Sequence, residues 1–113
     1  MSCLFCRIVN GEIPSRKVYE DEHVLAFHDI APQAPVHILI IPKKHYSTIL
    51  DINESDKELI GHIFLVAKRI AKEMAFDEKG FRVVVNCNSE GGQTVFHLHF
   101  HLLAGRVMHW PPG

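Results

Sequence analysis

Several features that mark particular classes of protein are missing from this sequence of 113 residues. It contains no apolar run near the roughly 20 residues that a membrane-spanning helix needs, so no such helix is expected. Its first residues lack a basic segment followed by an apolar stretch, and no secretory signal is visible. These absences predict a cytoplasmic protein with no membrane partner.

The cysteine count and the net charge argue against two further classes of protein. Three cysteines are present, and an odd number argues against a disulfide framework. The net charge is -1, from 12 basic and 13 acidic residues, which provides no electrostatic footprint for a nucleic-acid polymer. A mononucleotide needs only local donors and stays possible. With neither an internal repeat nor a low-complexity linker, the sequence predicts one domain over residues 1–113.

Hydrophobic periodicity predicts an α+β fold. A short helical turn is expected at residues 4–10, and a capping box of Ser55 and Glu58 opens one long helix with an apolar face from Leu59 to Met74. One such helix against about five mostly antiparallel strands forms a two-layer domain. The expected strands are residues 18–20 and 24–27, which form a hairpin, and residues 37–41, 81–86 and 97–103.

The segment HLHFHLL at residues 97–103 places His97, His99 and His101 in strict alternation with apolar residues. On a strand, alternate side chains share one face, so the three imidazoles form a row above buried apolar neighbours. Each has a reference pKa near neutrality and can attack an electrophile, move a proton or bind a metal. One ion held by all three is excluded, because the first and last lie about 13 Å apart along a strand.

This alternation resembles the signature of the histidine triad (HIT) family of nucleotide hydrolases and transferases. The resemblance covers nearly the whole chain and includes DIAPQAP at 29–35, HILIIPKKH at 37–45, Asn86, and GGQTVF at 91–96. The final segment GRVMHWPPG at 105–113 is similar to the Hint branch, the purine nucleoside phosphoramidases. The resemblance implies the HIT-like α+β fold and hydrolysis of the P–N bond of purine nucleoside 5′-monophosphoramidates.

The resemblance also assigns catalytic roles to four histidines. His99 is the expected nucleophile, because a neutral imidazole attacks phosphorus well and later leaves well. His101 is expected to donate to a phosphate oxygen as charge develops. His37 is expected to bond within the cluster, with His97 as the remaining member. No cofactor is expected to be required for catalysis.

A purine nucleotide, AMP or GMP or a phosphoramidate of either, is the expected ligand. Asp29 resembles the ribose-binding acid of the family, although an acid that caps the following proline-rich loop is an alternative. The glycines at 91–92 can bring backbone N–H groups close to phosphate, although a plain hairpin turn is the commoner role. The apolar members of the expected pocket can equally be core residues. The residues assigned to nucleotide binding are Phe5, Ile13, Phe27, Asp29, Ile30, Leu39, Asn86, Gly92, Gln93, Thr94, His99 and His101.

Cys3 and Cys6 form a CxxC motif, which resembles zinc-bearing bacterial relatives and departs from the animal Hint pattern. The resemblance supplies His45 and His97 as two further ligands. A tetrahedral Cys2His2 site without an open position is structural. In that case His97 would support the strand beneath His99 and could not move protons. A redox pair or two unpaired thiols near the terminus are the alternatives.

Trp110 is the only tryptophan, and it lies close to the C-terminus. By resemblance to Hint-type proteins, the chain is expected to form a homodimer in which Trp110 reaches the partner's active site. Two other functions remain open. One is hydrolysis of dinucleoside polyphosphates, which the Hint-like tail disfavours. The other is nucleotide binding without turnover, as a sensor or interaction module.

Overall fold

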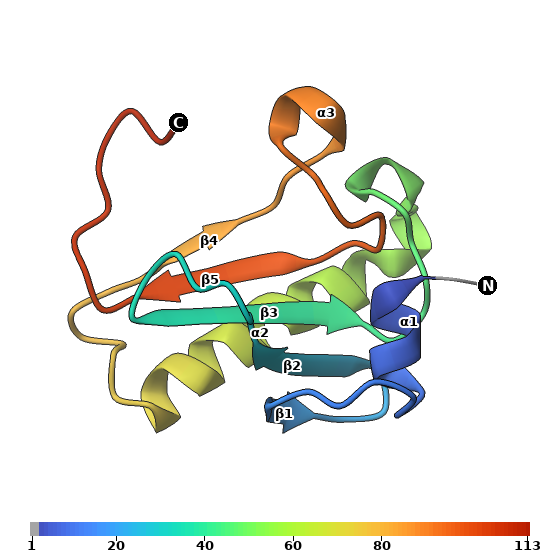
Figure 1. The fold of residues 1–113 in the computed structure, drawn as a ribbon, viewed down its shortest axis with the longest axis horizontal. Coiled ribbons are helices and arrows are strands. Elements are labelled where there is room, and N and C mark those ends of the chain that lie inside the picture. Colours follow the sequence, from blue (N-terminus) through green and yellow to red (C-terminus); the bar gives the residue numbers. More distant parts are fainter. Residues whose placement is uncertain (1–2) are drawn as a thin grey trace.

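The structure is a computed structural model that describes residues 3–113, and its centre is one antiparallel five-stranded sheet (Figure 1). The strand order is β1-β2-β3-β5-β4, with the long helix α2 along one face and the short helix α1 on the other. The predicted α+β architecture is therefore confirmed. Within residues 3–113, no helix combines the length and the apolar character needed to cross a bilayer. The elements are α1 Leu4–Val9, β1 Lys17–Glu20, β2 Val24–His28, β3 Val36–Pro42, α2 Lys57–Glu73, β4 Arg82–Val84, α3 Asn88–Gly91 and β5 Phe100–Ala104.

Alternation along the central strands divides the core between the two faces of the sheet. In β3, Ile38 and Ile40 lie in the core beneath α2, whereas Leu39 and Ile41 lie in a second core with Phe5 of α1. All five side chains are buried. Because successive strand residues point to opposite faces, the face that carries Leu39 also carries His37. The triad side of the sheet is thus the side that α1 covers.

The start of α2 differs from the prediction. The helix begins at Lys57, and Ser55 lies in a preceding 3-10 turn, Glu54–Asp56, so the predicted capping box of Ser55 and Glu58 is wrong. The carboxylate of Asp56 instead accepts from the backbone N–H of Asn53 at 2.8 Å and from the hydroxyl of Tyr46 at 2.8 Å. Asp56 thus stabilises the turn before the helix through Asn53 and ties it to Tyr46.

The apolar face of α2 is narrower than its sequence suggests. Its buried members are Ile63, Val66, Ala67, Ile70 and Ala71, at helical spacing. By contrast, two residues predicted for the same face are substantially exposed, with Phe64 at 49% and Met74 at 40%.

The triad strand is shorter than predicted. β5 begins at Phe100, so His97 and His99 precede it, and β4 covers only Arg82–Val84 of the expected 81–86. Before the strand, the backbone N–H of Leu98 donates to the carbonyl of Tyr46 at 2.7 Å instead of joining the β-ladder. The predicted burial of the intervening apolar residues is confirmed, since Leu98, Phe100 and Leu102 are at most 1% exposed.

Candidate active site

Two histidines on neighbouring strands are joined by a directed chain of hydrogen bonds. The backbone N–H of Gln33 donates to Nδ1 of His37 at 3.0 Å, so this nitrogen carries a lone pair and no proton. In the neutral ring the proton is therefore on Nε2, which lies 2.9 Å from Nδ1 of His101. His101 accepts that hydrogen bond and carries its own proton on Nε2. One backbone donor thus sets the tautomers of both imidazoles.

Burial keeps both of these imidazoles neutral near pH 7. Desolvation lowers the pKa of His37, and desolvation together with repulsion from His99 lowers the pKa of His101 to about 4. Nε2 of His101 is itself buried and has no hydrogen-bond partner within residues 3–113. A buried N–H without a partner is costly and rare. This donor is therefore available to an acceptor atom on a bound molecule.

The central histidine presents the complementary group. Nδ1 of His99 lies 2.7 Å from the carbonyl oxygen of His97, and since a carbonyl only accepts, Nδ1 carries the proton. The lone pair is then on Nε2. His99 is only 7% exposed. This burial lowers its pKa, so the ring stays neutral. Its centroid is 4.9 Å from that of His101. The site therefore pairs a nucleophilic nitrogen with an adjacent unpaired donor.

Asp29 completes this cluster without turning it into a metal site. Its carboxylate accepts from the backbone N–H of Ala31 at 2.8 Å and lies 3.4 Å from Nε2 of His37. Asp29, His37 and His101 place possible ligand atoms within 4.8 Å of one another, a spacing that a metal could use. A metal on Nε2 of His37 would need the lone pair there, whereas the Gln33 N–H holds the proton on that nitrogen. The hydrogen-bonded network is the arrangement that fits.

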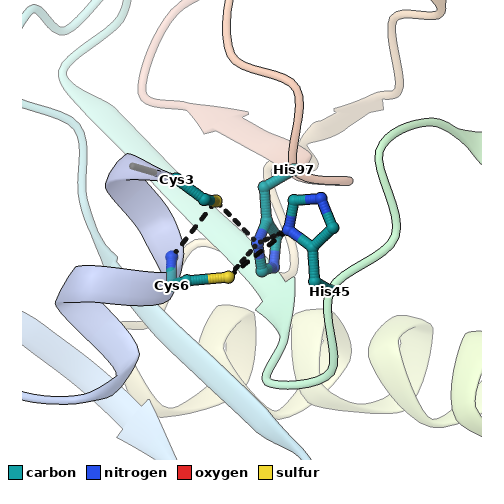
Figure 2. Close-up of side chains that lie close together, drawn as sticks. All are labelled: Cys3, Cys6, His45 and His97. Carbon is teal, nitrogen blue, oxygen red and sulfur yellow. Dashed lines mark hydrogen bonds between the residues drawn. The ribbon is translucent and has the colours of Figure 1, made fainter. Parts of the chain in front are cut away.

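A second cluster lies beside the triad, where the start of α1 meets two loops (Figure 2). Sγ of Cys3 is 3.4 Å from Nδ1 of His97, and Sγ of Cys6 is 3.3 Å from Nδ1 of His45 and 3.5 Å from Nδ1 of His97. The two Nδ1 atoms are 3.2 Å apart. All four side chains that the resemblance assigned to zinc therefore converge on one point.

The geometry of this cluster fits a tetrahedral zinc ion. Zinc bonds of about 2.0–2.1 Å to nitrogen and 2.3 Å to sulfur imply edges of about 3.3 Å between two nitrogens and about 3.6 Å between nitrogen and sulfur. The distances above match these edges. Nε2–H of His97 donates to the carbonyl of Pro42 at 2.8 Å. Nδ1 therefore has no proton, and its lone pair points into the cluster. Burial and the neighbouring Cys3 raise the pKa of Cys6 to about 11, and a cation would reverse that shift.

His97 belongs to both clusters through different groups. Its side chain faces Cys3 and Cys6, whereas its carbonyl oxygen holds the Nδ1 proton of His99. The ring of His97 is fully buried and burial lowers its pKa. His97 therefore orients the ring of His99 through its carbonyl, while its own ring is turned to the cysteines.

The sequence profile of the HIT domain family matches residues 10–108. The chain belongs to the HIT domain family. It is 50% identical to an uncharacterized HIT-like protein of Synechococcus elongatus over 97% of this chain and 96% of that protein. Among solved structures, a HIT family hydrolase from Legionella pneumophila superimposes with a TM-score of 0.97 at 56% identity, covering 99% of this chain and 100% of that one. A histidine triad protein from Clostridium difficile gives a TM-score of 0.94 at 56% identity, with 96% and 95% covered.

In this HIT domain, most of the apolar residues assigned to the purine pocket lie together. Phe5, Phe27 and Leu39 are buried in one cluster, against which the half-buried Ile13 packs. The ring of Phe5 stands edge-on to that of His99, with 5.2 Å between centroids. Ile30 is apart from them and fully exposed. Phe5, Phe27, Leu39 and Ile13 thus form an apolar wall beside His99 and are also part of the core. Their contact with a nucleotide stays a prediction.

The segment before the triad is a single turn of helix, α3, and Gly92 ends it with a φ of +82°. The side chain of Gln93 braces this turn. Its Oε1 accepts from the backbone N–H of Asn88 at 2.9 Å, and its Nε2 donates to the carbonyl of Ser47 at 2.8 Å and to a second carbonyl at 3.0 Å. Gln93 thus holds the loop in place, and a contact from it to phosphate stays a prediction. The other predicted contacts in the segment are the half-buried Asn86 and the exposed Thr94.

The C-terminal tail runs past the end of the sheet beside β4 (Figure 1). With β4 and β5 it encloses a cavity of about 540 Å³, whose strand residues include Arg82 and Leu103. Leu103 lies on the same face as His101, two residues away. Trp110 is 82% exposed in the single chain, and its contact with a partner stays a prediction. A cavity of about 680 Å³ beside the start of α2 contains no predicted site residue.

Three groups of the site escaped the sequence reasoning: the backbone N–H of Gln33, the carbonyl of Pro42, and the guanidinium of Arg106. The first two are main-chain groups and leave no trace in residue type. Arg106 donates from Nε and Nη2 to the carbonyl of Gln33, at 3.2 and 3.1 Å. The sequence indicated the proline-rich loop that contains Gln33, but not the residues that this loop contacts.

Proposed function

We propose that this HIT domain hydrolyses purine nucleoside 5′-monophosphoramidates through a nucleotide-bearing histidine. The observation that carries the proposal is the pairing of a bare Nε2 lone pair on His99 with an unpaired Nε2–H on His101, in rings 4.9 Å apart. The resemblance of the tail to the Hint branch supports the phosphoramidate substrate. The Legionella relative, described as a hydrolase, supports the reaction class.

Nε2 of His99 attacks the phosphorus, the P–N bond breaks, and its electron pair leaves with nitrogen, which departs as the amine after gaining a proton from solvent. The positive charge on the nucleotide-bearing imidazole is stabilised by the carbonyl of His97 at Nδ1. Nε2–H of His101 donates to a phosphoryl oxygen as charge develops. Water then displaces His99 from phosphorus, which releases the nucleoside monophosphate and a proton.

The remaining assignments complete the proposal. Asp29 binds the ribose hydroxyls, and the wall formed by Phe5 and its neighbours holds the purine. Zinc, when bound by Cys3, Cys6, His45 and His97, supplies a structural cross-link and takes no part in the displacement. The protein acts as a homodimer in the cytoplasm.

A rate panel tests this function. Adenosine and guanosine phosphoramidates are compared with dinucleoside polyphosphates, and the enzyme is analysed by mass spectrometry after rapid quenching with substrate. We expect turnover of the phosphoramidates and a mass increase of one nucleotide that is lost in His99→Ala. Replacing the exposed His23, which lies outside the site, provides the control. Preferred cleavage of polyphosphates would favour the sister activity, and tight binding without turnover would favour a nucleotide sensor.

A further inference from the structure

The loop between β2 and β3 is held by the turn that follows β5, two segments that Figure 1 shows meeting at one end of the sheet. Gly105 has a φ of +93°, and a Cβ placed there would lie 2.7 Å from Cβ of Pro35. This spacing shows that the turn passes directly against the proline-rich loop. One residue later, Nε and Nη2 of Arg106 donate to the carbonyl of Gln33 at 3.2 and 3.1 Å. The guanidinium thus binds the loop through two hydrogen bonds to one carbonyl oxygen.

Arg106 thus holds Gln33, and the backbone N–H of Gln33 determines which ring nitrogens of His37 and His101 are protonated. The carbonyl of Gln33 accepts from Arg106, and its N–H donates to Nδ1 of His37. The Nε2–H of His37 in turn donates to His101. Hydrogen bonds on both sides of the Gln33 backbone therefore connect the start of the tail to the imidazole of His101, with the covalent backbone of Gln33 between them. Within residues 3–113 Arg106 makes no ion pair, so its hydrogen bonds to this loop are its main polar contacts.

We propose that Arg106 is a positioning residue, which keeps the Nε2–H of His101 pointed at the substrate by fixing the N–H of Gln33 against His37. The proposal rests on the proposed function for its catalytic consequence, although its effect on the histidines stands without it. If the Gln33 N–H moves away, His37 is free to place its proton on Nδ1. Its Nε2 then accepts from His101, and His101 offers a lone pair where it previously offered a donor.

Loss of the guanidinium shifts this balance without unfolding the loop. The side chain of Gln33 donates to the carbonyl of Ala31 at 3.0 Å, which retains part of the loop geometry. Pro32 and Pro35 restrict the backbone on either side. The expected state of Arg106→Ala is therefore a folded protein in which the two tautomers of His37 and His101 are mixed.

The test measures the tautomers directly. Wild type and Arg106→Ala are prepared with ¹⁵N-labelled histidine, and two-bond proton–nitrogen correlation spectra identify which ring nitrogen is protonated in His37 and His101. We expect the Nε2–H form of both in the wild type, displacement towards a mixture in Arg106→Ala, and partial recovery in Arg106→Lys, which keeps one donor. Arg69→Ala is the matched control, since Arg69 is an exposed arginine paired with Glu73 on α2, on the opposite face of the sheet.

Kinetics supply the second readout. A displaced donor should lower kcat about 10- to 100-fold while KM changes little, because small misplacement at a reacting centre costs rate more than binding. Unchanged His37 and His101 signals in Arg106→Ala, or an equal response in Arg69→Ala, would overturn the proposal. If the signals move but neither protein hydrolyses phosphoramidates, the positioning role stands and the proposed function fails. If turnover is normal in Arg106→Ala and the signals are unmoved, the function stands and the positioning role fails.

Discussion

Substitution of two glycines with nearly the same backbone conformation can separate the effect of backbone strain from the effect of the close contact at the end of β5. Gly80 has a φ of +98° and Gly105 a φ of +93°. An alanine at either position incurs the left-handed penalty of about 1–2 kcal/mol. The surroundings differ, because a Cβ at 80 meets nothing within 4 Å in the described chain, whereas a Cβ at 105 lies 2.7 Å from Pro35.

The clash should therefore add to the backbone penalty only in Gly105→Ala. The proline ring is rigid, so relief requires movement of the backbone, and forced overpacking typically costs about 1–3 kcal/mol. We expect Gly80→Ala to lose about 1–2 kcal/mol of unfolding free energy and Gly105→Ala to lose about 2–5 kcal/mol in total.

Urea unfolding of the two variants and the wild type, at one protein concentration and with metal retained, measures both losses. Equal losses, within about 0.5 kcal/mol, would refute the reasoning that the turn and the loop are in tight contact. Movement of Pro35 should also disturb Gln33, so Gly105→Ala should lower kcat while Gly80→Ala should not.

Three further outcomes are expected. Because burial lowers the pKa of His37 and of His101, the latter to about 4, the unfolded chain binds more protons below pH 6.5. Their stabilising effect is complete above pH 6.5 and declines towards pH 4, and His101→Gln should flatten the dependence of the urea midpoint on pH in that window. Removal of metal by a chelator should lower the Tm more than the activity at moderate temperature, and elemental analysis below a tenth of an equivalent of zinc would contradict the zinc assignment. Deletion of residues 110–113 should change leaving-group selectivity more than affinity for the nucleotide, and a monomer by light scattering at micromolar concentration would contradict the dimer.

Side-chain periodicity was sufficient to predict the layers of the fold. The apolar run at residues 37–41 correctly indicated a buried strand, and the alternation after His97 correctly indicated that Leu98, Phe100 and Leu102 are buried. The spacing of Ile63, Ala67 and Ile70 likewise indicated the buried side of α2, although it did not indicate Val66. Patterns of this kind depend on local geometry, and so they can be read without knowledge of the neighbouring elements.

The errors arose where a distant partner decides local structure. Ser55 has the residue type of a cap, but it lies in a 3-10 turn whose Asp56 accepts hydrogen bonds from Asn53 and from the distant Tyr46. His97 and His99 fit a strand pattern, but β5 begins only at Phe100, because the backbone N–H of Leu98 donates to the carbonyl of Tyr46. The tautomer of His37 depends on a backbone N–H, which every residue except proline possesses. Contacts of this kind cannot be predicted from the identity of the residue alone.

The place of β5 in the sheet has a consequence for how the protein is made. It is the last strand in the sequence, yet it lies between β3 and β4 and contacts both. Until the ribosome has released residues 100–104, β4 has no neighbour with which to pair, so an incomplete chain lacks two strands and not one. Such late, long-range pairing slows folding and exposes apolar surface meanwhile. A nascent chain stalled before Phe100 should therefore be a target for chaperones, even though most of its residues have already been synthesised.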